Sequence, residues 1–261
     1  GLMVIIKANA TRHILSFKTA PPVLNMASRR RFRAGRNLPY RDAEPYKSSL
    51  YYWWWAFLKR NSLYHKTCIQ GGNGLLSKLY RDFGDIYNMG FLTWWDSHQI
   101  LFAEQCSILD GESPISSDQN LLYRIDPQKS FSQIQEEIRA LHLRAHAIMP
   151  VQTQERQSTA QYPIYTNVSA HTLHKAMKVW DLHCAKPTIS AYDLGILAGF
   201  KPNILPLNKY GDKRTQSAAA IERHNKQARA SIANQTNRYL RTAGQYIDNV
   251  GRGEFPKALR R

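Results

Sequence analysis

The most regular pattern of this chain lies in residues 215–250, which read TQSAAAIERHNKQARASIANQTNRYLRTAGQYIDNV. At 100° per residue, the apolar positions of this segment fall within about 40° of one line. They are Ile221, Ala228, Ile232, Tyr239, Ala243, Tyr246 and Val250. On the opposite half lie Arg223, Lys226, Arg238 and Arg241. The pattern predicts a long helix that packs on protein along one side and is cationic along the other, with Gly244 as a point where it kinks or divides.

The cations of the chain are concentrated at its two ends. Residues 1–41 hold nine Lys and Arg and no acid, and residues 201–261 hold thirteen against four acids. The residues between them hold fourteen basic and fifteen acidic side chains, so the body is nearly neutral although the whole chain carries a charge of +17. Cationic ends suit a polyanion, because neutralised phosphates release counterions. This segregation favours a nucleic-acid partner over the alternative of a merely basic protein.

Composition excludes two classes of protein. Apolar residues make up 43% of the chain, including six Trp, which is too much hydrophobic material for a wholly disordered protein. The apolar run at residues 2–6 is far too short to cross a bilayer, so no integral membrane protein is predicted. Cys68, Cys106 and Cys184 lie far apart without a CxxC pair. They indicate reduced thiols in an intracellular protein, cytoplasmic or nucleoid-associated.

Residues 1–45 are expected to form a basic, disordered arm or extension. The first 25 residues contain no acid, which suits either an organellar transit peptide or an extension ahead of a start at Met26. Five guanidiniums come next, at Arg29, Arg30, Arg31, Arg33 and Arg36. Such a cluster suits phosphate contacts or an A·T-rich minor groove. A solvated tail or a localisation signal is the alternative.

Residues 46–106 are predicted to form an aromatic helical domain. The first helix face is formed by Leu50, Trp53, Trp54, Phe57 and Leu58, which follow helical spacing. Further helices are predicted around residues 75–80 and 91–104. We expect the core to bury most Trp rings and leave Trp55 the most exposed, because three adjacent Trp cannot all face inward. Residues 107–168 read as a linker with a short strand at 121–125 and a helix capped by Ser130.

Residues 169–261 are predicted to form a basic helical domain. Ser190 or Thr188 is expected to cap a short helix over residues 191–198. Segment 188–200, TISAYDLGILAGF, resembles the first helix and turn of helix-turn-helix DNA-binding proteins. Such a unit needs small residues where helices cross and a Gly in the turn, which Gly195 and Gly199 supply.

The residues after this segment depart from the helix-turn-helix pattern. Pro202 and Pro206 exclude a recognition helix directly after the turn. The resemblance therefore implies a variant in which the helix from Thr215 onward reads the DNA. An ordinary helical hairpin with a Gly turn is the alternative.

The sequence contains no motif that indicates catalysis: no P-loop, no Ser/His/Asp arrangement and no paired carboxylates with a pocket signature. His142 with His146, and His171 with His174, have spacings at which two side chains could share a metal. Without an HExxH arrangement, surface or capping roles are favoured. We therefore predict a protein that is not an enzyme and that uses no cofactor and no metal.

Together these patterns predict a mainly α protein: an aromatic helical bundle, then a basic helical domain with a helix-turn-helix-like unit and a long C-terminal helix. The predicted function is DNA binding, as a regulator or architectural factor. RNA binding in a ribonucleoprotein, or a scaffold for an acidic protein partner, is the alternative. The predicted phosphate contacts come from the arginine arm and from Lys209, Lys213, Arg214, Arg223, Lys226, Arg229, Arg238 and Arg241. Base discrimination would come from Gln216, Asn225, Gln227 or Asn234, because amides pair bidentately with adenine.

Overall fold

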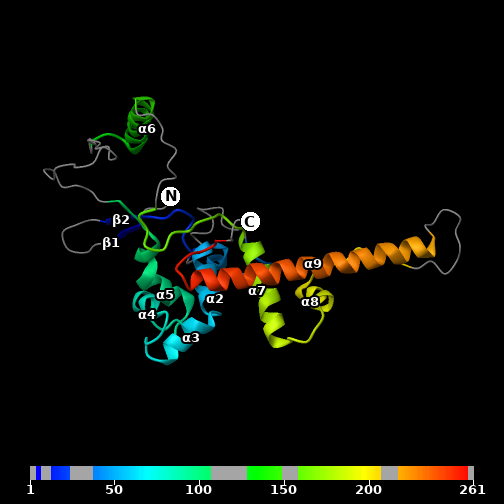
Figure 1. Ribbon diagram of the computed structural model, residues 1–261. Coiled ribbons are helices and arrows are strands. Elements are labelled where there is room, and N and C mark those ends of the chain that lie inside the picture. The colour runs from blue at the N-terminus through cyan, green and yellow to red at the C-terminus, as the bar shows by residue number, and fades with distance from the viewer. Residues whose placement is uncertain are drawn as a thin grey trace.

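The computed structural model describes residues 4–6, 13–23, 38–106, 128–148, 158–206 and 217–257. Within these residues the chain is mainly helical, which confirms the predicted fold class, and a small sheet lies at one end (Figure 1). The strand predicted at 121–125 and the arginine arm at 29–36 lie outside the described residues.

Short helices form the bundle in the N-terminal half. They are η2 (Pro45–Ser48), α2 (Leu50–Leu58), α3 (Ser62–Ile69), α4 (Ser77–Phe83), α5 (Phe91–His98) and η3 (Gln99–Phe102), the η elements being 3-10 helices. α2 begins where the side chain of Ser49 accepts a hydrogen bond from the N–H of Tyr51, and α3 where Asn61 accepts from the N–H of Tyr64. Each cap pairs an N–H that the first helical turn leaves free. The helix predicted over 91–104 ends earlier, at His98, and continues as η3.

Aromatic side chains fill the core of this bundle. Trp53, Trp54, Trp94 and Trp95 are each no more than 3% exposed, which confirms the expectation that helical spacing buries them. The indole N–H of Trp94 donates to the carbonyl of Phe83 at 3.1 Å, so the polar atom of that ring is paired. Trp55 is half-buried and, as predicted, is the most exposed of the three adjacent Trp.

A small antiparallel sheet lies against the bundle. β1 (Val4–Ile6) pairs with β2 (His13–Ser16), and β2 pairs with β3 (Glu104–Cys106). Leu15 is 1% exposed, and the ring centroid of Phe17 lies 5.6 Å from that of Trp95. The expectation of a disordered arm through residue 45 does not hold for these strands. Leu15 of β2 is buried, and Phe17, directly after β2, packs against the aromatic core although the surrounding sequence is basic and free of acids.

Two C-terminal helices, α7 (Ala170–Ala185) and α9 (Ala218–Val250), complete the same core. Leu173 of α7 and Tyr246 of α9 belong to one cluster of buried residues with the helices of the bundle. Phe255, beyond the end of α9, is fully buried, with its ring centroid 5.6 Å from that of Phe57. The two regions predicted as separate helical domains therefore share a hydrophobic core.

Polar bonds also connect the bundle to the C-terminal helices. Arg60 donates two hydrogen bonds of 2.6 Å to the carboxylate of Asp181 on α7. The side-chain amide of Asn61 donates to the carbonyl of Ile247 on α9 at 2.8 Å. The bidentate pairing fixes the relative orientation of Arg60 and Asp181, and the single bond of Asn61 adds a connection to α9.

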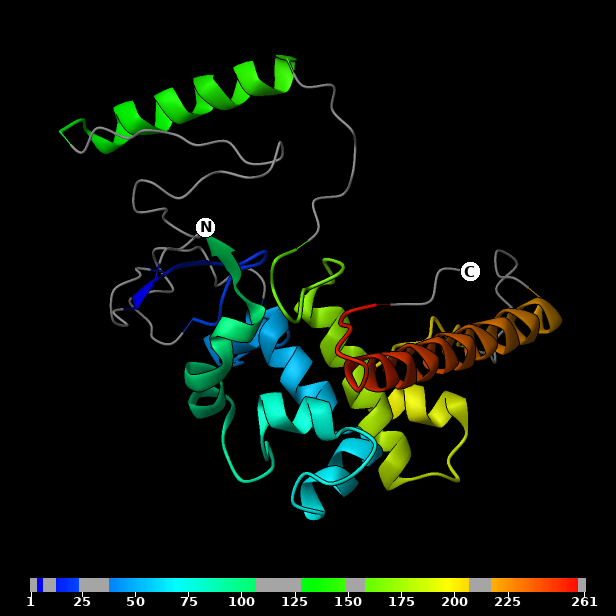
Figure 2. The same ribbon diagram turned by 60° about the vertical axis from the view of Figure 1, so that its left-hand side comes forward.

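Helix α6 (Phe131–Ile148) stands apart from the other helices (Figures 1 and 2). Its predicted start is confirmed: the Ser130 hydroxyl accepts from the N–H of Gln133, whose side chain accepts from the N–H of Ser130. Phe131 is 75% exposed and Leu143 is 62% exposed, so parts of its apolar surface face solvent. In the described part of the chain, no helix has both the length and the hydropathy needed to cross a bilayer.

Candidate nucleic-acid interface

Helix α8 (Ala191–Ala198) and the turn after it form where the sequence predicted them. The Ser190 hydroxyl accepts from the N–H of Asp193 at 3.1 Å and caps the helix, so of the two predicted caps the structure uses Ser190 and not Thr188. Gly199 ends the helix with a φ of 97°, a left-handed conformation that glycine adopts without steric cost.

Gly195 lies where α8 crosses α9 at short range. A Cβ at this position would stand 2.4 Å from Oγ1 of Thr236 and 2.7 Å from Cγ2 of Ile232. Non-bonded atoms do not approach that closely, so any larger residue would push the two helices apart. The predicted use of a small residue at a helix crossing is confirmed here, and the crossing lies about halfway along α9.

Residues 201–206 continue from the turn without forming a helix, as Pro202 and Pro206 predicted. This segment lies along the first turns of α9. The side-chain amide of Asn225 accepts from the N–H of Leu205 at 2.8 Å and donates to its carbonyl at 2.9 Å. These bonds attach the segment to the N-terminal part of α9.

Helix α9 is continuous over 33 residues, from its Ser217 cap through Gly244. The predicted apolar line is confirmed: Ala228 and Tyr239 are half-buried and the others are buried, namely Ile221, Ile232, Ala243, Tyr246 and Val250. Gly244 does not divide the helix. A Cβ there would meet the ring of Trp180 at 3.4 Å, which is ordinary contact.

The opposite side of α9 is cationic, as predicted. Its exposed cations are Arg223, Lys226, Arg238 and Arg241, and Arg229 is exposed on the flank between the two sides. None of them forms an ion pair with an acid in the described part of the chain. At 1.5 Å per residue, the row spans about 27 Å along the helix. α9 extends past α7 and α8, so its first turns project from the body (Figures 1 and 2).

Several other predicted contact residues cannot be placed. The arginine arm, with Arg29, Arg30, Arg31, Arg33 and Arg36, and the residues Lys209, Lys213, Arg214 and Gln216 lie outside the described ranges. The remaining predicted residues all lie on α9. The structure therefore brings together only the part of the predicted site that one helix carries.

The predicted base-reading amides differ in availability. Gln227 and Asn234 are exposed on α9. Asn225 uses both the donor and the acceptor of its amide on Leu205, so a contact with a base would require both bonds to break. The exposed amides on the cationic helix are thus better placed to meet a ligand than Asn225.

The unpaired state of these cations determines what the surface can do. A guanidinium that already holds a carboxylate must give it up before it binds a phosphate, whereas these side chains have no such bond to break within the described residues. A row of free cations on a rigid helix can neutralise successive phosphates without rearranging the protein. The surface therefore has the chemistry of a polyanion site.

Sequence reasoning missed a second group of residues with ligand-binding character. Tyr40, Trp53, His174 and Lys178 line a pocket of about 410 Å³ between α2 and α7. Tyr40 falls in the segment that the sequence predicts to be disordered. The spacing of His174 in the sequence relates it only to His171, as a possible pair of metal ligands. The signal that could have been used is the change from basic to apolar residues at 38–40.

Of the two histidine pairs, the structure describes the side chains of His171 and His174 only. The ring of His171 donates from Nδ1 to the carbonyl of Pro39 at 3.0 Å, which connects α7 to the segment before η2. The side chains of His142 and His146 lie outside the described part of the chain. Among the described residues, no group of three or more His, Cys, Asp or Glu side chains could hold a metal ion.

Comparison of this chain with protein-family models, with curated proteins and with solved structures finds no match. Its function must therefore be inferred from the geometry of the chain itself.

Proposed function

We propose that this protein binds double-stranded DNA through the cationic side of α9, as a regulator or an architectural factor. The observation that carries the proposal is the row of exposed cations from Arg223 to Arg241, which lack acidic partners among the described residues. From Ile232 onward the other side of the same helix is buried against α8 and the hydrophobic core, which fixes the direction in which the helix runs.

The mechanism has an electrostatic part and a groove part. Phosphates displace counterions when the cations bind them, which supplies affinity for any sequence. The turns of α9 before its crossing with α8, residues 218–231, extend about 20 Å at 1.5 Å per residue. A projecting helix of this kind fits the major groove of B-DNA, where the amide of Gln227 could pair with adenine.

Two further cationic segments belong to the same proposal. The arginine arm, residues 29–36, would contact phosphates or enter the minor groove. Lys209, Lys213 and Arg214 immediately precede α9 in the sequence and would extend its cationic surface. The helix-turn-helix resemblance of residues 188–200 fits a reading helix that begins near Thr215.

Fluorescence anisotropy of a labelled DNA duplex, titrated across a series of salt concentrations, tests the proposal. The double variant Arg223→Glu and Lys226→Glu should weaken binding at least tenfold at moderate salt and flatten the dependence of affinity on salt. The matched control is Lys66→Glu with Lys78→Glu, which changes the net charge equally on exposed positions of the bundle. Unchanged affinity in the first variant, or equal loss in the control, would remove α9 from the interface.

RNA binding is the second candidate, because it uses the same cations. Binding of single-stranded RNA would also use exposed aromatic rings as stacking surfaces. Four Trp rings are buried and cannot serve in this way: Trp53, Trp54, Trp94 and Trp95. Titration of single-stranded RNA in the same assay separates the two: tighter binding to RNA than to duplex DNA would favour the ribonucleoprotein role. Absence of binding to any nucleic acid at low salt would favour an acidic protein partner.

A further inference from the structure

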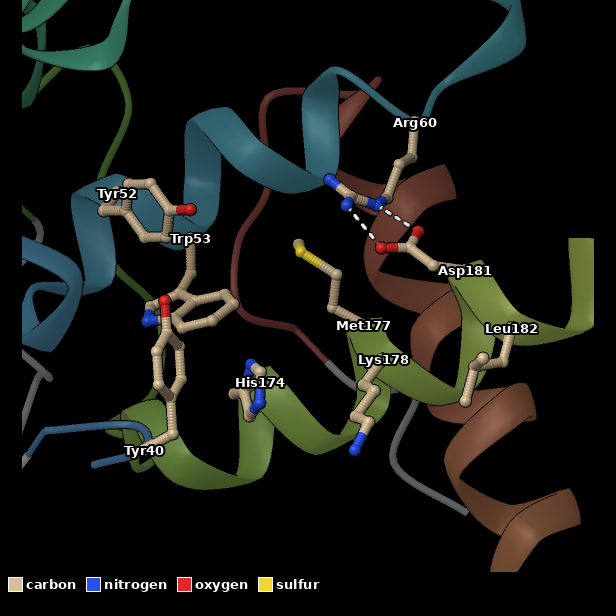
Figure 3. A pocket seen from close by; sticks show the side chains of 9 residues that line it. All are labelled: Tyr40, Tyr52, Trp53, Arg60, His174, Met177, Lys178, Asp181 and Leu182. Carbon is tan, nitrogen blue, oxygen red and sulfur yellow. Dashed lines mark hydrogen bonds and ion pairs between the residues drawn. The ribbon is translucent and has the colours of Figure 1, made fainter. Parts of the chain in front are cut away.

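The pocket between α2 and α7 has a largely apolar floor (Figure 3). Trp53 of α2 is 2% exposed, and Met177 and Leu182 line the pocket from α7. Its volume of about 410 Å³ lies within the range in which proteins bind small molecules. Residues of two segments far apart in the sequence thus form a concave surface that neither builds alone.

Tyr40 forms one end of the pocket, with its ring standing beside His174 at a centroid distance of 4.6 Å (Figure 3). Two hydrogen bonds hold it there. The Nζ of Lys47 donates to the Tyr40 hydroxyl at 2.7 Å, and His171 donates to the carbonyl of Pro39 at 3.0 Å. The ring is 37% exposed although it is fixed in this way, so it offers a pre-positioned aromatic surface.

Three polar side chains line the pocket without a hydrogen-bond or ion-pair partner in the described part of the chain: Tyr52, His174 and Lys178. Burial lowers the pKa of His174, and electrostatic interactions with Lys178, His171 and Lys47 lower it further, while Asp181 opposes them. The imidazole is therefore neutral near pH 7 and offers both a donor and an acceptor. These groups can pair with the polar edge of a heterocycle.

The charges of the pocket select the sign of the ligand. Arg60 is neutralised by its two hydrogen bonds to Asp181, at the end opposite Tyr40 (Figure 3). Lys178 is exposed and has no acidic partner among the described residues. The lining therefore carries one net positive charge, which disfavours the cationic ligands that aromatic cages often take and favours an anion.

We propose that this pocket binds a nucleoside monophosphate unit, with the base against Tyr40 above the Trp53 floor and the phosphate on Lys178. The pocket offers the ligand an aromatic surface, neutral polar groups and a free cation, which match a base, its edge and its phosphate respectively. The site is separate from the cationic side of α9, so either assignment can fail alone. A free mononucleotide and a nucleotide of a single strand share this chemistry.

Isothermal titration calorimetry of the full chain with AMP, adenosine and inorganic phosphate tests the site. We expect one molecule of AMP per chain, bound at least tenfold more tightly than adenosine or phosphate alone. Tyr40→Ala should weaken AMP binding at least fivefold through the lost stacking, and Lys178→Gln at least tenfold through the lost charge-assisted hydrogen bond. Lys78→Gln, an exposed lysine on α4, is the matched control and should bind as the unchanged protein does.

Absence of measurable heat with AMP at millimolar concentration would overturn the proposal, as would unchanged AMP binding in both Tyr40→Ala and Lys178→Gln. A tetra-adenylate titration identifies the source of the ligand once AMP binds. Tighter binding of the tetranucleotide, with the same loss in Tyr40→Ala, would assign the site to a single strand. Equal or tighter binding of AMP would assign it to the free mononucleotide. Duplex affinity measured by anisotropy on Tyr40→Ala tests the α9 proposal separately.

Discussion

The aromatic bundle and the projecting part of α9, residues 218–231, use their cations in opposite ways. In the bundle, Lys47 pairs with Glu44 and Arg60 with Asp181. In the projecting part, Arg223, Lys226 and Arg229 have no acidic partner among the described residues. Exposed cations such as Lys66 and Lys78 also lack an ion pair among the described residues, but only α9 carries several along one helix. Under the proposed function, the paired cations of the bundle stabilise the fold and the unpaired cations of the projecting part bind the ligand.

The composition of the projecting part fits this separation. Ile221 is buried and Asn225 is bonded to Leu205, but this part contributes nothing to the two hydrophobic clusters; residues 218–230 also contain five Ala, the residue with the highest helix propensity. Ser217 caps its start by accepting from the N–H of Ala220. From Ile232 onward the helix packs on α8 and then on the core. Local propensity supports the first part and burial supports the second.

The largest effect is expected from a change in the bundle. Trp54→Ala should lower the free energy of unfolding by about 3–5 kcal/mol, because it empties the centre of a close-packed aromatic core. Its ring is fully buried, with its centroid 4.8 Å from that of Phe83. Urea unfolding followed by circular dichroism measures the loss. Trp55→Ala, at the half-buried neighbour, should cost clearly less; equal losses would contradict the described orientation of α2.

Two glycines of the C-terminal helices should respond in opposite directions. Gly195→Ala should lower the free energy of unfolding by about 1–3 kcal/mol, because its Cβ would overlap Thr236 and Ile232 of α9. Gly244→Ala should leave it unchanged or raise it by up to about 1 kcal/mol, because the site has room and alanine favours the helix. Thermal or urea unfolding of both variants checks the pair. A destabilised Gly244→Ala with an unaffected Gly195→Ala would mean that the α8–α9 crossing is placed wrongly.

How much of this molecule could be predicted depends on whether a pattern is local. The apolar line of α9 and the cap and turn of α8 repeat at helical spacing within one segment, so the sequence alone predicted them. The pairing of β2 with β3 could not be predicted in that way, because Ile14 pairs with Cys106, ninety-two residues away. The pocket was missed for the same reason, since Tyr40 and His174 meet only after α7 packs on the bundle.

Reversing the charge of the projecting helix should affect binding and leave stability almost unchanged. Arg223→Glu with Lys226→Glu should alter the free energy of unfolding by no more than about 0.5 kcal/mol, because both side chains are exposed and unpaired among the described residues. Urea unfolding of the same preparation used for DNA titration tests this. A stability loss above about 2 kcal/mol would show that the two cations also support the fold and would end the separation proposed above.

The smallest effect concerns pH. The pKa of His174 lies below its ordinary value of 6.5 because of burial and neighbouring cations, so the unfolded chain takes up a proton at higher pH than the folded one. His174 therefore contributes stability that is present above pH 6.5 and is lost as the pH falls through its folded pKa. Urea unfolding at pH 7.5 and pH 5.5 should show a smaller drop in His174→Gln than in the unchanged protein. An identical drop in both would show that other groups control the pH dependence.

The shared core has a consequence for the order in which the chain acquires its structure. Phe57 is covered by Tyr246 and Phe255, nearly two hundred residues later in the sequence. During synthesis the aromatic helices leave the ribosome long before these partners do. They must wait with an open apolar surface until the last helix arrives. Contacts of such long range slow folding, so a chaperone that shields this surface would be expected to raise the yield of folded protein.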